Sequence, residues 1–326
     1  MGVKIKETGI KKRYLLMILV VLSLLSLFIG VSALSINDVI ALKEDKVRLL
    51  MISRVPRLMS ILVSGVGLGV SGLIMQQISR NKFVSPTTAA TTDFAKLGIL
   101  MGMLWFGKAG QMTQMLIAFT FAMAGTVLFM IMMRRIQFKN VIFVPLVGMM
   151  LGKVVGSITN YFAFKYDLVQ NISSWMEGNL SVIMSGNYEM LYLSIPVVGL
   201  GFLYANQFTI AGMGEDFATN LGLNYKTIVN MGLGIVALIT AVTLVTVGNI
   251  PFLGLIIPNM VSLYVGDHMK NTLYHTALLG PIFLLICDIL GRVIIYPFEV
   301  SIGMMVGVIG GVLFLVMILR RANQYA

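Results

Sequence analysis

Long stretches without a charged residue constrain this chain more than any other feature of its sequence. Residues 58–79 contain no Asp, Glu, Lys or Arg, and neither do the 40 positions between Lys226 and Asp267. About 20 apolar residues suffice to cross the hydrocarbon core of a bilayer, so the longer stretch exceeds one crossing. With 58% hydrophobic and only 11% charged residues, the sequence predicts a protein that crosses the membrane many times.

We expect an all-α polytopic membrane protein with about ten transmembrane helices in one domain, residues 1–326. The first helix is expected over 14–37 and uncleaved, because this stretch is longer than the ~7–15 apolar residues of a signal peptide. Residues 248–251, Gly-Asn-Ile-Pro, divide the longest stretch into a seventh helix and a short eighth. The other expected helices cover 58–79, 86–105, 115–133, 140–164, 190–207, 252–265, 272–295 and 300–319.

The basic residues predict the orientation of these helices. On this topology 14 of the 24 Lys and Arg residues are cytoplasmic, in keeping with the positive-inside rule. Both termini are then cytoplasmic, including residues 1–13. The net charge of +11 follows from this distribution and does not require a nucleic-acid partner. The basic external segment Lys43–Arg57 departs from the rule, which suggests a function there.

A few charged residues are expected inside spans, where charge is costly. Asp93 and Lys96 are three positions apart and Asp288 and Arg292 four, spacings at which helical side chains can pair. Lys153 is expected ~20 Å into the fifth helix. Its ammonium group could contact an anionic cargo, find a structural partner or extend to the membrane surface.

The segment Gly214–Gly222 is a polar island between apolar stretches. Glu215 and Asp216 suit the first turn of a helix, and Gly222 suits its end. Phe217, Ala218 and Leu221 add an apolar stripe to this expected surface helix. It lies within residues 206–226, between the sixth and seventh spans, and is therefore expected on the cytoplasmic face.

Motifs typical of enzymes are not found in the sequence. His268 and His275 do not form a metal-binding HExxH motif, and a Walker A sequence is missing. The single cysteine, Cys287, provides neither a disulfide framework nor a cysteine metal cluster. We therefore expect no catalytic residues, no metal site and no directly bound cofactor. Any energy for the protein's work must then come from outside the chain, and the Gly214–Gly222 segment is the best candidate for the contact with its source.

Several motifs, in order along residues 50 to 321, together resemble the iron-siderophore and vitamin B12 class of ABC importer permeases, a FecCD-like family. The resemblance is specific as a combination, although each motif alone is weak. The matching motifs are Arg54-Val55-Pro56-Arg57, Ser71-Gly72 with Met75-Gln76, Arg80-Asn81 with Pro86, Gly214-Glu215 with Leu221-Gly222, residues 251–259, Asp288 with Arg292, and Ile302-Gly303.

This resemblance implies a transport subunit in the bacterial plasma membrane that works with partners. These are a second permease, homologous or identical, two ATPase subunits that bind ATP and Mg²⁺, and an extracytoplasmic siderophore-binding protein. The cargo is a ferric siderophore, moved by alternating access. The resemblance makes the 214–222 segment the ATPase-coupling helix and makes Arg54, Arg57 and Arg292 docking residues, with headgroup contact as the alternative. It also places the inner gate near Asn140, Val141 and Ile142.

One motif departs from the family pattern, since Pro258-Asn259 stands where Pro-His is usual; we expect both residues at the pathway or gate. Residues 76–88 look like the branch that handles catecholate or mixed-type siderophores such as petrobactin or anguibactin. An ion-coupled secondary transporter, supported by Lys153, is the first alternative function. A polytopic membrane enzyme is the second.

Overall fold

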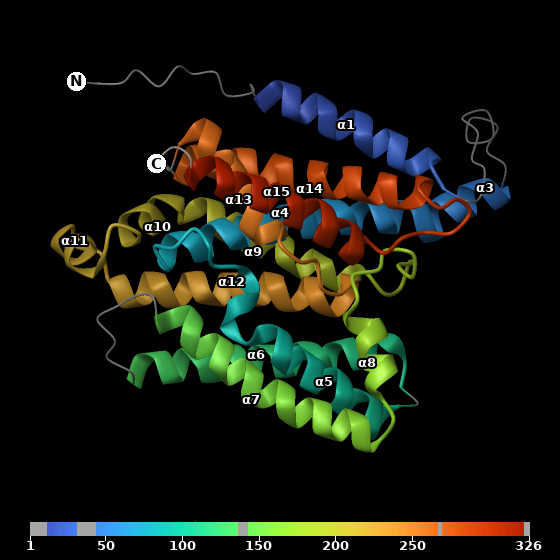
Figure 1. Ribbon diagram of the computed structural model, residues 1–326, viewed down its shortest axis with the longest axis horizontal. Helices are drawn as coiled ribbons and strands as arrows, with labels where there is room; N and C mark the ends of the chain where they lie inside the picture. Colours follow the sequence, from blue (N-terminus) through green and yellow to red (C-terminus); the bar gives the residue numbers. More distant parts are fainter. Residues whose placement is uncertain (1–11, 31–43, 108, 136–142, 267–268, 323–326) are drawn as a thin grey trace.

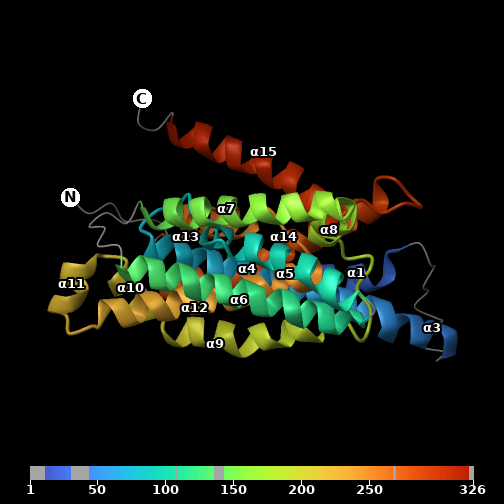
Figure 2. The ribbon, with the colours of Figure 1, turned by 90° about the horizontal axis from the view of Figure 1, so that it is seen from below.

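The computed structural model describes residues 12–30, 44–107, 109–135, 143–266 and 269–322. Within these ranges the chain is a bundle of α-helices without a β-strand (Figure 1). The helices α3 (Glu44–Leu49) and α11 (Glu215–Asn220) mark opposite ends of its long axis in both views (Figures 1 and 2). We call these the α3 end and the α11 end.

The centre of the bundle consists of helices with small residues at their contacts. In α4 (Val55–Ile78) and α12 (Tyr225–Val247), 72% of the most apolar window is buried. The glycines of α4 let other backbones approach closely: Gly65 lies against Gly280 and Pro281 of α14 (Met269–Val293). A Cβ atom at Gly72 would overlap the Gly254 carbonyl of α13 (Leu253–Val265). Small residues thus allow these helices to pack closely.

Three peripheral helices expose much more apolar surface. In α6 (Gln111–Arg135) and α7 (Phe143–Lys165) 33% of the apolar window is buried, and in α15 (Ile302–Ala322) only 22%. Figure 2 shows α7 and α15 on the same side of the bundle, opposite α9 (Ser194–Leu203). α5 (Thr91–Phe106) packs against α6 and α7, and α1 (Lys12–Phe28) packs against α14.

Every expected helix has a counterpart, but several differ from the prediction, and the first ends at Phe28. The basic segment expected before the second span is itself helical, because α3 and a π-helical turn η1 (Leu50–Arg54) continue directly into α4. The sixth helix is not straight: after the 3₁₀ turn η3 (Glu189–Leu193) it bends by 61° between α9 and α10 (Ala205–Ala211). Tyr204 stands at the bend, three residues after Gly201.

The predicted third helix is interrupted near its start. Pro86 begins a 3₁₀ turn η2 (Pro86–Ala89), and Ala90 takes a left-handed conformation (φ 61°) before α5 begins. A short helix α8 (Val169–Met176) lies at the α3 end between α7 and η3. Six described helices are long and apolar enough to cross a membrane, or seven with the bent pair counted as one span. The number of ten crossings and the cytoplasmic termini stay predictions.

Candidate functional site

The predicted surface helix is α11, held between two glycines with positive φ. Gly214 precedes it at φ 119° and Gly222 follows it at φ 79°, backbone conformations that residues other than glycine rarely adopt. These glycines let the chain leave α10, form one short helix and return into α12. The sequence prediction of a short helix bounded by glycines is confirmed, and it projects from the end of the bundle (Figure 1).

The side chains of α11 divide between the bundle and the surface. Phe217 and Leu221 are 49% and 57% exposed, and the Glu215 and Asp216 side chains are exposed as well. Ala218, in contrast, is fully buried, so its inclusion in an apolar contact stripe was wrong. A small residue at this position lets α11 lie close to the bundle. The surface presented outward therefore combines two carboxylates with two large apolar side chains, a combination suited to a protein partner.

Two residues at the end of α4 support this segment, and sequence reasoning assigned neither to it. The side chain of Gln77 lies against Gly212, and Arg80 lies against Gly214, 3.1 Å from where a Cβ would stand. Arg80 itself has a left-handed backbone (φ 45°) in the turn after α4. A cleft of about 260 Å³ opens here between α4, α13 and α14. It is lined by Leu73, Gln76, Gln77, Arg80, Asn81, Lys82, Gly212, Pro258, Ser262 and Thr272.

Pro258 and Asn259 lie at the contact between α13 and α4, and both are buried. Proline has no N–H, so Pro258 leaves the Gly254 carbonyl without its helical donor. The Gln76 amide donates to that carbonyl at 3.4 Å and to the Leu255 carbonyl at 3.2 Å. The freed carbonyl therefore faces protein and has a hydrogen-bond donor.

Asn259 ties α13 to the turn that follows α4. Its Nδ2 donates to the Lys82 carbonyl at 2.7 Å and to the Leu255 carbonyl at 2.8 Å. A gating role for Pro258 and Asn259 stays a prediction. The other expected gate residues, Asn140, Val141 and Ile142, lie outside the described residues.

The charges expected inside the third and fifth helices are arranged differently from the prediction. Lys96 of α5 does not pair with Asp93; its Nζ donates to Asn160 Oδ1 of α7 at 2.7 Å. Asp93 instead lies against Gly152 and Gly156 of α7. Lys153 is exposed on the same helix. The i, i+3 spacing of Asp93 and Lys96 did not predict their contacts, because α7 lies close enough to contact both side chains.

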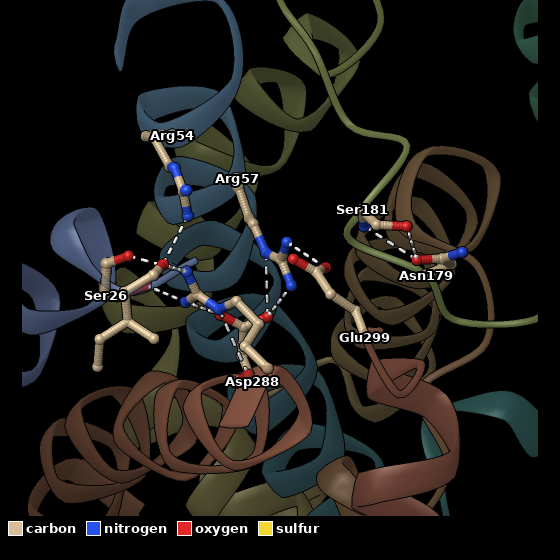
Figure 3. Close-up of polar contacts among 9 residues, drawn as sticks. Ser26, Arg54, Arg57, Asn179, Ser181, Asp288 and Glu299 are labelled. Atoms are coloured by element: carbon tan, nitrogen blue, oxygen red, sulfur yellow. Dashed lines mark hydrogen bonds and ion pairs between the residues drawn. The ribbon is translucent and has the colours of Figure 1, made fainter. Parts of the chain in front are cut away.

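The arginines at the α3 end form a buried ionic cluster (Figure 3). Arg57 donates to Asp288 Oδ1 from Nε at 3.1 Å and from Nη2 at 2.7 Å, and from Nη1 to Glu299 Oε2 at 2.7 Å. Arg292 pairs with Asp288 Oδ2, which confirms the predicted i, i+4 pair. The contact between Arg57 and Asp288 joins positions 231 apart and was not predicted.

The same cluster fixes the end of α1. Arg292 donates to the Ser26 hydroxyl at 2.6 Å and to the carbonyls of Ser26 and Ile29 at 2.9 and 2.6 Å. Arg54 donates to the Ile29 carbonyl at 2.5 Å. These carbonyls are beyond or near the end of α1 and have no partner within that helix, so arginine donors suit them. The three predicted docking arginines are thus close together, and each is already bonded within the chain.

A model of the FecCD transport family matches residues 18–320. The chain belongs to the FecCD transport family. It is 56% identical to the petrobactin import system permease protein YclN of Bacillus subtilis over 311 residues, 95% of this chain and 98% of that protein. It is 39% identical to the ferric-anguibactin transport system permease protein FatD of Vibrio anguillarum, over 91% of this chain and 95% of that one.

A solved structure of a metal-chelate type ABC transporter in an inward-facing conformation shares the fold. Its TM-score is 0.84 at 21% identity, with 95% of this chain and 98% of that chain covered. The resemblance stated from sequence motifs is confirmed, including its siderophore branch. This FecCD protein is a transport permease, and family membership decides against an enzyme and against an ion-coupled carrier.

Proposed function

We propose that this FecCD permease carries a ferric siderophore of the catecholate or mixed type across the bacterial plasma membrane, as part of an ATP-driven ABC importer. The support is the high identity, over nearly the whole chain, to permeases named for petrobactin and anguibactin. Iron enters this account only as the chelated cargo.

The observation that carries the proposal of ATP-driven transport is the exposed surface of α11. Phe217 and Leu221 present large apolar area beside Glu215 and Asp216 at the tip of the bundle. Burial of such side chains in a partner's cleft is favourable, and the carboxylates add orientation. We assign this surface to one of two ATPase subunits, which bind ATP and Mg²⁺. A second permease, homologous or identical, contributes the other coupling helix.

Movement of α11 can reach the pathway through the contacts of α4. Gln77 and Arg80 touch the backbone around Gly212 and Gly214, and Gln76 on the same helix bonds to α13. A shift of α11 would therefore push on α4 and on the turn after α4 that Asn259 of α13 holds. We propose that this connection drives alternating access, with gate residues at Asn140–Ile142 and Pro258–Asn259.

The α3 end is the proposed docking site of the extracytoplasmic siderophore-binding protein. Arg54, Arg57 and Arg292 lie together at this end, and the family resemblance implies that these arginines are docking residues. Guanidinium groups attract an acidic partner surface. Arg57 and Arg292 already bond to Asp288 and Glu299. A docking carboxylate must therefore either bind an arginine alongside these acidic residues or displace one of them.

The test is reconstitution of the complex from this chain, its permease partner, the ATPase subunits and the binding protein in lipid vesicles. We expect ATP hydrolysis to rise when ferric petrobactin and the binding protein are both present, and iron to accumulate inside the vesicles. Transport driven by an ion gradient without ATP would refute the proposal. A rate of ATP hydrolysis that does not change when ferric petrobactin and the binding protein are added would refute it as well.

A further inference from the structure

A polar stripe crosses the exposed face of α7 at the depth of the membrane centre. Lys153 lies ten residues after Phe143 and twelve before Lys165, hence about 15 and 18 Å from the two helix ends. The hydrocarbon core is about 30 Å thick, so Lys153 is near its middle. Ser157 and Asn160 follow at i+4 and i+7, and all three side chains are exposed.

A second cation from α5 joins this stripe. Lys96 Nζ donates to Asn160 Oδ1 at 2.7 Å. The nearby carboxylate, Asp93, lies 3.0 Å from where a Cβ of Gly156 would stand, and the charges of Lys153 and Lys96 both act on it. Neither lysine forms an ion pair with any residue in the described ranges. Two ammonium groups against one carboxylate leave the stripe positive.

Neither lipid nor a second permease of this sequence supplies the missing negative charge. Hydrocarbon cannot solvate an ammonium group at this depth, and phosphate headgroups lie more than a side-chain length away. Three peripheral helices with much exposed apolar surface, α6, α7 and α15, contain no Asp or Glu over their described lengths. A copy that places these faces against α7 therefore adds no counter-charge.

We propose that Lys96 and Lys153, together with the Asn160 amide, form an anion subsite in the pathway for the negatively charged ferric chelate. This inference rests on the proposed function and adds the residues and charge of the cargo site. Catecholate oxygens bind iron in deprotonated form, so a ferric chelate held by two or more catecholate groups carries net negative charge. The subsite offers two ammonium groups and an amide, donors that suit catecholate and carboxylate oxygens.

The first test asks whether the stripe faces water and attracts anions, independently of transport. Lys153→Cys in the assembled complex is treated with an anionic sulfonate and a cationic trimethylammonium methanethiosulfonate, which react with ionised thiols. We expect both reagents to react. The rate of the anionic reagent, relative to that of the cationic one, should be at least about threefold higher with Lys96 present than without it, because Lys96 attracts the anion. Adding Lys96→Met should remove that preference.

Two controls accompany this measurement. The parent chain is the blank, since its single cysteine, Cys287, is fully buried. Val20→Cys, on an exposed apolar stretch of α1, should resist both reagents because lipid covers it. If Lys153→Cys is equally inert, or reacts without preference for the anion, the subsite does not exist.

The second test is uptake of ferric petrobactin by the complete complex. Lys96→Met with Lys153→Met should raise the half-saturating chelate concentration about tenfold, at the lower end of what hydrogen bonds to charged groups contribute. Lys165→Met, at the end of the same helix, should leave it unchanged. Normal uptake by the double variant would refute the subsite alone, whereas a wild-type complex that moves no ferric chelate would refute the proposed function.

Discussion

The two ends of the bundle contain the same kinds of charged residue and use them in opposite ways. At the α3 end, Asp288 and Arg292 are 3% and 2% exposed and bond to each other and to Arg57. At the α11 end, Glu215 and Asp216 are exposed beside Phe217. Charges that neutralise one another inside the chain hold helices together, whereas charges displayed with apolar side chains are available to a partner. Substitutions at the two ends should therefore differ in kind.

The largest effect on stability is expected from Asp288→Asn. An amide cannot neutralise Arg57 and Arg292, and breaking a buried ion pair from one side costs about 3–5 kcal/mol. The thermal unfolding midpoint of the purified protein in detergent should fall sharply. Asp288→Leu with Arg292→Met should recover part of the loss, because Arg57 keeps Glu299. Wild-type stability in Asp288→Asn would mean that the cluster does not hold the helices together.

A smaller loss is expected from Asn259→Ala, which removes a neutral tie near the α11 end. The Lys82 carbonyl loses a 2.7 Å hydrogen bond, and an unsatisfied buried group costs about 1–3 kcal/mol. Denaturant unfolding checks this value. Tyr264→Ala on the same helix is the control, since this side chain is 65% exposed and should change stability by no more than about 0.5 kcal/mol.

Glu299→Gln compares the partly exposed carboxylate of the ionic cluster with the buried one, Asp288. The Glu299 side chain is 21% exposed, so its 2.7 Å pair with Arg57 is partly solvated and contributes about 0–1 kcal/mol. Its unfolding midpoint should lie close to that of the wild type. A loss as large as that of Asp288→Asn would show that Glu299 belongs to the buried part of the cluster.

The smallest effect on stability is expected at α11 itself. Glu215→Gln with Asp216→Asn removes two exposed charges and should change the free energy of unfolding by less than about 0.5 kcal/mol. Binding of the ATPase subunits, measured by co-purification at several salt concentrations, should weaken and lose part of its salt dependence. If the same variant unfolds readily instead, the α11 carboxylates are structural and the contrast between the two ends fails.

Much of the fold could be predicted because the signals are local. Uncharged runs located the helices, glycines located the turns around α11, and the i, i+4 spacing located the pair between Asp288 and Arg292. The i, i+3 spacing of Asp93 and Lys96 misled, because Asn160 on another helix receives the Lys96 hydrogen bond. The bend at Tyr204 lies three residues after Gly201, and the sequence prediction treated that glycine as part of one straight span.

The sites were predictable in composition and less so in geometry. The residues of α11 were identified, but only its packing shows that Ala218 faces inward while Phe217 faces outward. Three arginines were grouped by resemblance, yet the partner of Arg57 lies 231 positions away and depends on the packing of α4 against α14. The supporting contacts of Gln77 and Arg80 likewise follow from tertiary structure alone.

The most direct test of the central claim is Glu215→Arg with Phe217→Asp, measured for siderophore uptake and ATPase co-purification in the same preparation. Reversal of one charge and loss of one apolar contact should abolish both, while membrane insertion and the unfolding midpoint stay those of the wild type. Normal uptake by this variant would contradict the assignment of α11 as the surface through which ATP hydrolysis drives transport.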